Sequence, residues 1–314
     1  MNNESSNFKI TKMKKIFLFI IITCSCIEHA KACDICGCGA GNNYVGILPE
    51  FRARILGIRY RYNSIKTHLG INGETYLSKT ENYRTAELWG AWNLRPDFRL
   101  MVTLPYTFNE RIGTDGKFSQ SGMGDISAGA YYQLLQNKNQ DKKQHLLIQS
   151  LWIGGGVKLP TGQYRDTNKD NANFFQSGTG STDFFAQAMY DIRRQDAGLN
   201  LNALYKLNTA NKESYQYGSR FSASAQFYYK WKAGKSFTIA PNAGMAFETS
   251  AEDTNKDIKV FASGGNVLLG TAGIECNTKK LLFGASFQSP FTQDMANGFA
   301  KAQNRMMVHV AVIL

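Results

Sequence analysis

Apolar and polar residues alternate along most of the chain after Phe51. In the first run, Leu56, Ile58 and Tyr60 alternate with small or charged residues. A period of two places neighbouring side chains on opposite faces of a β-strand. Twelve such runs occur, at 56–62, 86–94, 98–108, 126–134, 147–159, 184–192, 199–207, 221–231, 237–247, 267–276, 281–288 and 306–314. The pattern therefore predicts a chain made almost wholly of strands, each with one apolar face.

The length of the runs indicates a membrane barrel. Most are about nine to thirteen residues long, which suits a tilted transmembrane strand, whereas strands of soluble proteins average about five or six. The face opposite the apolar one is small or polar, as in a wall between lipid and water. We expect an all-β protein, a closed transmembrane up-and-down antiparallel β-barrel of about 12 strands, in the outer membrane of a Gram-negative bacterium.

The connections between runs alternate in length. Short polar connections occur at 95–97, 194–197, 232–236 and 277–279, and one of intermediate length at 135–144. Long connections occur at 66–81, 109–123, 160–180, 210–218, 249–266 and 289–304. Outer-membrane barrels have short periplasmic turns and long external loops. The alternation therefore predicts an even number of strands with both chain ends in the periplasm.

The first 32 residues resemble a secretory signal peptide. Three lysines within 12–15 precede a short apolar core at 16–23, and residues 30–32 read Ala-Lys-Ala, an A-x-A cleavage signal. We predict a removed signal peptide over 1–32, a cysteine-rich periplasmic segment over 33–50 and the barrel over 51–314. Cleavage would leave Cys33 first, so a lipoprotein acylated at Cys33 is an alternative.

The charge balance is basic. The chain carries 36 Lys and Arg against 24 Asp and Glu, and loss of 1–32 removes five lysines and two glutamates, leaving a net charge of +9. A basic protein can bind nucleic acid, but an exported barrel meets lipopolysaccharide instead, or biases a pore toward anions. The expected partners are the lipid bilayer, lipopolysaccharide, the outer-membrane insertion machinery and an unknown small-molecule substrate, with no nucleic acid.

Three cysteines follow the predicted cleavage site. Cys33, Cys36 and Cys38 have the spacing C-x-x-C-x-C, within the sequence CDICGC. Clustered thiolates bind soft ions such as Cu(I) or Zn²⁺. A local disulfide is the alternative in an oxidising compartment. A Cu or Zn site at these cysteines is therefore a hypothesis, and no other cofactor is expected.

Charged residues on the polar faces of the runs are candidates to line a lumen. They lie between apolar residues expected to face lipid, and rings of charge inside a pore set its charge selectivity. Alternation alone selects Arg59, Arg61, Glu87, Arg99, Asp125, Lys158, Asp183, Lys206 and Lys230.

Three short motifs follow one another in mid-chain: GMGD at 122–125, KLPTG at 158–162 and GTGS at 178–181. Their order resembles the family named for the meta-pathway of phenol degradation, over about 122–205. The resemblance implies an outer-membrane β-barrel transporter, loosely like the long-chain hydrocarbon channels, and brings no agreed catalytic residues. By themselves, Gly122 and Gly124 are expected to allow a tight strand entry with positive φ. Glycines 154–156 are expected to mark a bend or a close backbone approach.

The chain shows no enzyme signature. A phosphate loop, a dinucleotide fingerprint and an H-E-x-x-H motif are missing from the sequence, so we expect no catalysis. The leading hypothesis is an outer-membrane channel or transporter for small solutes, hydrophobic or anionic. The alternatives are a metal-handling outer-membrane protein that uses the CDICGC segment, and a structural or surface-adhesion barrel whose long loops bind partners.

Overall fold

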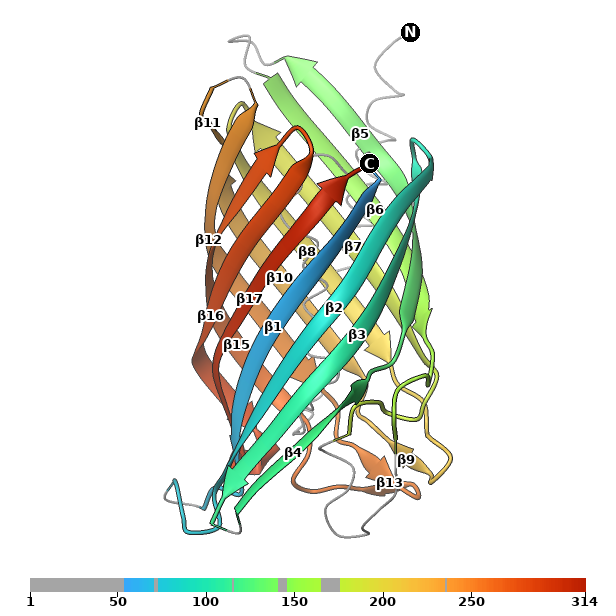
Figure 1. Ribbon diagram of the computed structural model, residues 1–314, viewed down its shortest axis with the longest axis vertical. Helices are drawn as coiled ribbons and strands as arrows, with labels where there is room; N and C mark the ends of the chain where they lie inside the picture. Colours follow the sequence, from blue (N-terminus) through green and yellow to red (C-terminus); the bar gives the residue numbers. More distant parts are fainter. Residues whose placement is uncertain (1–53, 71–72, 115, 141–145, 165–175, 235) are drawn as a thin grey trace, which may run out of the picture. The chain divides into compact units, whose positions relative to one another are not determined.

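The computed structural model describes residues 54–70, 73–114, 116–140, 146–164, 176–234 and 236–314. Twelve long antiparallel strands form one closed barrel (Figure 1). These strands are β1 (Ile55–Thr67), β2 (Lys79–Arg95), β3 (Phe98–Gly113), β5 (Ser127–Gln140), β6 (Leu146–Lys158), β7 (Asp183–Arg194), β8 (Ala197–Leu207), β10 (Arg220–Tyr229), β12 (Phe237–Ser250), β15 (Gly265–Thr278), β16 (Leu281–Met295) and β17 (Lys301–Ile313). The predicted barrel is confirmed.

The first and last strands close the barrel. β1 pairs with β17 from Ile55 opposite Ile313 to Lys66 opposite Lys301. The backbone N–H of Leu314 also donates to the carbonyl of Arg54, at 2.9 Å. Closure satisfies the backbone groups that an open sheet edge would leave exposed to lipid. A chain with this ladder can cross hydrocarbon without an unsatisfied edge.

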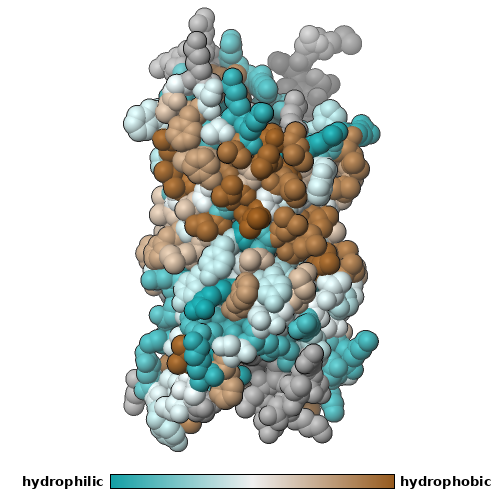
Figure 2. All heavy atoms as spheres, in the orientation of Figure 1, coloured by the Kyte–Doolittle hydropathy of each residue, from teal (hydrophilic) through white to brown (hydrophobic). Residues whose placement is uncertain are grey.

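The two faces of the wall differ as the alternation predicts. Each of the twelve strands exposes at least one large apolar side chain, whereas inward neighbours such as Arg59 and Glu87 are buried. On the face shown in Figure 2, apolar side chains gather in a belt nearer the end that holds the C-terminus in Figure 1, and polar side chains cover the opposite end. A closed barrel with an apolar outer belt spans a membrane, and barrels of this class occupy the outer membrane. Among the described residues, no helix is long and apolar enough to cross a membrane.

Short turns join the strands at one end of the barrel and long connections join them at the other (Figure 1). The prediction of a loop at 109–123 is wrong. β3 continues to Gly113 and pairs with β4 (Gly116–Met123), so this region is a projecting hairpin. The sequence hides it because both faces of the hairpin are largely polar and exposed. Short strand β11 (Trp231–Lys232) and the 3-10 helix η1 (Ala296–Gly298) lie in other connections.

Two long connections pack on each other through a small sheet. β9 (Tyr215–Gln216) pairs with β13 (Thr254–Asn255), which pairs with β14 (Ile258–Lys259). Asp253 joins the two connections, because its carboxylate accepts a hydrogen bond from the hydroxyl of Tyr215 at 2.7 Å and one from the backbone N–H of Gly218 at 2.7 Å. The connections at 210–218 and 249–266, expected as plain loops, are thus ordered against each other.

Apolar clusters inside the barrel lie toward its two ends. One includes Ile65, Tyr83 and Leu269 near the long connections. Two others lie nearer the short turns, one with Ile55, Trp89 and Leu282 and one with Tyr131, Trp152 and Met189. Charged and polar side chains fill much of the interior between them. The predicted signal peptide and the cysteine segment lie outside the described residues.

Candidate functional site: the charged interior of the barrel

A group of three charges lies on β1 and β2. Arg59 stands directly opposite Glu87 in the strand register, and its Nε donates to Glu87 Oε2 at 2.6 Å. Arg61, one inward position further along β1, donates to the other oxygen of the same carboxylate. Two guanidinium groups therefore share one carboxylate, and this part of the interior has a positive excess.

An ion pair and a histidine–carboxylate contact link strands that are not direct neighbours. Arg305 on β17 reaches Glu248 on β12, with Nη1 at 2.8 and 2.9 Å from the two carboxylate oxygens. His309 on β17 lies 3.2 Å from Glu275 on β15. Both pairs pass over at least one intervening strand on the inner face. The interior charges thus form contacts along the barrel wall rather than isolated rings.

A buried polar network surrounds Asp125, where the strand is interrupted between β4 and β5. One carboxylate oxygen accepts the backbone N–H of Gly162 at 2.9 Å. The other accepts the backbone N–H and the hydroxyl of Thr179, at 2.9 and 2.8 Å, and lies 2.7 Å from Lys158 Nζ. Asp125 therefore holds both ends of the connection between β6 and β7 against the barrel.

Asp183 extends this network to the next strands. It lies 2.8 Å from Lys158 Nζ and 3.2 Å from Lys206 Nζ. Its other oxygen accepts the hydroxyl of Ser181 at 2.9 Å and the backbone N–H of Thr209 at 3.1 Å. Two carboxylates and two ammonium groups alternate here, and each buried charge has an opposite partner, which burial of charge requires.

The glycines of the three motifs allow this close packing. A Cβ on Gly162 would lie 2.8 Å from Asp125 Oδ1 and 2.7 Å from the Cα of Gly178. A Cβ on Gly178 would meet the same carboxylate oxygen at 2.8 Å. Side chains at these positions would exclude the backbone from the network. The motifs GMGD, KLPTG and GTGS are therefore parts of one assembly.

The expected conformation of the first motif is wrong. Neither Gly122 nor Gly124 has a positive φ, and a Cβ on Gly124 would instead crowd the Pro105 ring at 2.9 Å. Glycine is needed there for close approach rather than for a left-handed turn. In mid-strand, Gly156 leaves space for the Phe185 ring, 2.5 Å from the position of its absent Cβ. That region is a close approach between neighbouring strands, as one of the two sequence interpretations had it.

The structure brings seven of the nine predicted lumen residues into two groups, the Arg59–Arg61–Glu87 group and the Asp125–Lys158–Asp183–Lys206 group. Arg99 is fully buried on β3, opposite Tyr131. Lys230 is buried beyond the end of β10, with its Nζ 5.6 Å from the Tyr228 ring centre. These two residues belong to neither group.

Sequence reasoning missed several interior charges, including Glu248, Glu275 and Arg305. Arg305 occupies an alternate position to Met306, so a strict count of alternation would have placed it inward. The apolar Met307 on the same face obscured that signal.

Cys33, Cys36 and Cys38, the candidate metal ligands, lie outside the described residues. Within the part of the chain that the structure describes, no group of three or more His, Cys, Asp or Glu side chains is placed to hold a metal ion. The one cysteine described, Cys276, is a half-buried free thiol.

Residues 46–305 match the family model described as Putative MetA-pathway of phenol degradation. The chain belongs to this family. The match covers the three motifs and nearly all of the barrel, so the family assignment rests on most of the chain rather than on the motifs alone.

The barrel also resembles solved structures. An outer membrane channel from Pseudomonas putida F1 is 14% identical with a TM-score of 0.57, and the alignment covers 87% of this chain and 99% of that chain. The beta domain of the Bordetella autotransporter Brka is 11% identical with a TM-score of 0.45, covering 83% and 100%. At these identities the likeness concerns the fold. No curated protein matches the chain.

Proposed function

We propose that this family member is a narrow channel that carries small solutes across the outer membrane. The observation that carries the proposal is the chemistry of the interior. Arginine, lysine, glutamate and aspartate side chains extend from Arg99 near the short turns to Asp125 near the long connections. A polar interior is what water-filled outer-membrane channels have, and charged side chains along it act on the solutes that pass.

The connection between β6 and β7 supports a narrow entrance. Ser177, Thr179 and Ser181 are buried in the interior, held by Asp125 and Asp183. A connection fixed in this way reduces the open cross-section near the long connections. It would restrict passage to small molecules, and the charges beside it would act on any solute that enters.

The membrane environment follows from the same architecture. The apolar belt contacts the lipid bilayer, and the long connections would face lipopolysaccharide at the cell surface. Insertion by the outer-membrane assembly machinery is part of this proposal, since closed barrels of this class are delivered to that membrane from the periplasm.

Solute flux through vesicles that contain the refolded protein tests the proposal. A matched pair of variants separates the lumen from the outer wall. Ser224 on β10 is half-buried and faces inward, whereas its neighbour Ala225 is exposed and faces outward. Ser224→Trp is expected to reduce small-solute flux and single-channel conductance by roughly half or more, while Ala225→Trp leaves them unchanged, because only the first narrows the pore. Equal flux in all three proteins, or in vesicles without protein, would contradict a channel.

A further inference from the structure

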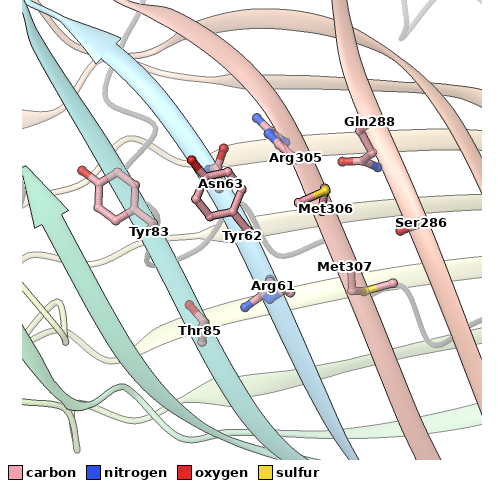
Figure 3. A pocket seen from close by; sticks show the side chains of 10 residues that line it. All are labelled: Arg61, Tyr62, Asn63, Tyr83, Thr85, Ser286, Gln288, Arg305, Met306 and Met307. Carbon is pink, nitrogen blue, oxygen red and sulfur yellow. The ribbon is translucent and has the colours of Figure 1, made fainter.

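A small cavity lies on the inner wall beside β1 and β17 (Figure 3). Its volume is about 40 Å³, which is enough for about three water molecules or for the charged group of a small solute. Arg61, Asn63, Tyr83, Gln288 and Arg305 contribute polar groups to its lining. The cavity is separate from the Asp125 network, whose residues lie on other strands.

Strand register explains why these side chains gather. Asn63 on β1 lies opposite Arg305 on β17, and Arg305 lies opposite Gln288 on β16. Two residues along, Arg61 lies opposite Met307. Because the side-chain period of a strand is two, both rows project into the barrel. Two guanidinium groups and two amides therefore share one patch of the inner wall.

Only one of the three nitrogens in the Arg305 guanidinium makes a hydrogen bond among the described residues. Its Nη1 donates to both oxygens of Glu248, and its side chain is 7% exposed. Nε and Nη2 are buried, and neither has a hydrogen-bond partner among the described residues. These two N–H groups form the edge of an arginine that binds a carboxylate with two parallel hydrogen bonds. Buried donors without a partner are uncommon in proteins, so this edge is suited to a ligand.

The amide of Asn63 has the same property. Both its oxygen and its nitrogen are buried, with no hydrogen-bond partner in the described part of the chain. Since Asn63 is the register partner of Arg305, the two unsatisfied groups lie side by side. Together they offer three donor nitrogens and one acceptor oxygen at one place in the cavity.

Charge and apolar surface narrow the class of ligand. Arg59 and Arg61 share the single carboxylate of Glu87, so an added negative charge near Arg61 is favoured. Glu81, one inward row nearer the long connections, accepts the hydroxyl of Tyr83 at 2.5 Å. A hydroxyl leaves the charge of a carboxylate unchanged, so an anion is favoured on the side of Arg61, away from Glu81. Met307 is buried beside the guanidinium groups and gives apolar contact that a bare inorganic ion would not use.

We propose that this cavity binds the carboxylate of a small organic acid, with its two oxygens on Nε and Nη2 of Arg305 and one of them also on the amide nitrogen of Asn63. The apolar body of the acid lies toward Met307 and the lumen. The proposal rests on the channel function proposed above and gives it a substrate class, monocarboxylates with a small apolar body.

Binding of benzoate to the refolded protein in detergent micelles, measured by calorimetry, tests this site. Benzamide is the control ligand, because it has the same shape without the charge and reports any partition into the micelle. Benzoate is expected to bind at least about tenfold more tightly than benzamide, since paired charge-assisted hydrogen bonds are the strong ones. Raising the chloride concentration is expected to weaken benzoate alone, and inorganic phosphate is expected to compete poorly. Equal binding of the two aromatic ligands, or preferential binding of phosphate, overturns the proposal.

Arg305→Lys is the decisive variant. Lysine keeps a positive charge for Glu248 but lacks the two-pronged edge, so benzoate affinity is expected to fall about tenfold. Arg95→Lys, at the last residue of β2 with a 74% exposed side chain, is the matched control and is expected to bind as the parent does. If Arg305→Lys does not refold, as judged by loss of the heat-dependent shift in gel mobility, Asn63→Ala decides. It breaks no ion pair, and unchanged benzoate affinity in it contradicts the site.

Binding and flux separate this proposal from the channel. If benzoate does not bind while neutral solutes still cross vesicles, the site is wrong and the channel stands. If benzoate binds as expected and no solute crosses, the site stands and the channel is wrong.

Discussion

His309 and Glu275 meet across Gly284, which lies between them on the inner face of β16. The imidazole Nε2 is 3.2 Å from the carboxylate, and a Cβ on Gly284 would lie 2.6 Å from the imidazole Cε1. The contact therefore exists because the residue beneath it has no side chain. It also shows how an interior polar contact in this barrel depends on a glycine of the strand that lies between the two partners.

Gly284→Val is expected to separate this pair and to lower the free energy of unfolding by about 1–3 kcal/mol, the usual cost of adding bulk to a packed interior. Unfolding of vesicle-inserted protein by urea measures it. Ala285→Val, whose side chain is exposed on the outer face, is the control and is expected to change stability little. A Gly284→Val protein as stable as the control would show that the pair tolerates separation.

Asp125→Asn is expected to loosen the connection between β6 and β7. The amide side chain keeps one acceptor oxygen, yet Gly162, Thr179 and Lys158 all donate to the carboxylate. Amide hydrogen exchange of Gly162 and Thr179 is expected to become at least about tenfold faster, because a hydrogen bond to a charged group contributes roughly 1.5–3 kcal/mol. Single-channel conductance is expected to rise as the entrance widens.

The control for that experiment is Asp97→Asn, in the turn after β2, where the carboxylate makes an exposed ion pair with Arg95. It removes the same charge with the same side-chain geometry, far from the network. Unchanged exchange at Gly162 and Thr179 in Asp125→Asn, or an equal effect in Asp97→Asn, would argue against Asp125 as the residue that holds the connection.

Glu87→Gln is expected to make the pore more selective for anions. Arg59 and Arg61 then lose their shared counter-charge, and the local excess of positive charge grows. Reversal potentials in a potassium chloride gradient measure the shift, which is expected toward chloride. Glu74→Gln, at a carboxylate whose side chain is 63% exposed, is expected to leave the reversal potential unchanged. A shift toward potassium in Glu87→Gln would contradict an ion path past this group.

The packing of the loop sheet is expected to depend on pH. Burial raises the pKa of Asp253 to about 6, whereas an aspartate in an unfolded segment titrates near 3.9. Between about pH 4 and 6 the packed form therefore binds more protons than the open form, so the packing is strongest below that window and weakens as pH rises through it. Hydrogen exchange at Tyr215 and Gly218, corrected for its intrinsic pH dependence, measures this.

In Asp253→Asn the dependence is expected to disappear, since no group titrates at that position. Asp257→Asn changes an exposed residue of the same connection and is expected to keep the dependence of the parent. A pH profile that survives in Asp253→Asn would assign it to another group.

The barrel could be predicted from the sequence because alternation is local. Each run of apolar and polar residues shows a strand with two different faces, and strands such as β8 and β10 need no knowledge of their partners to be recognised. The hairpin of β3 and β4 was not predicted, because Glu110 and Lys117 lie in a region without an apolar face. Strand structure persists there through backbone pairing and polar contacts such as the ion pair between Lys117 and Glu110, at 2.6 Å.

The interior site was less predictable. Alternation placed Arg59 and Glu87 on inward positions, but their contact depends on strand register, which a single strand does not encode. The network around Asp125 depends on a connection folded against the wall, and only the glycine motifs signalled it. Arg305 was missed because it shares its face with Met307, and a mixed face gives no clear pattern.

The Asp125 network also bears on the order in which the barrel assembles. Its charged residues are Asp125, two positions before β5, and Lys158, Asp183 and Lys206 on β6, β7 and β8. These strands follow one another in the chain and pair as consecutive hairpins. The network can therefore be completed before β1 meets β17. Two carboxylates and two ammonium groups would then enter the bilayer already neutralised in pairs, and an unpaired charge in hydrocarbon is costly. The half-built barrel would carry its most polar contents as a set with no net charge.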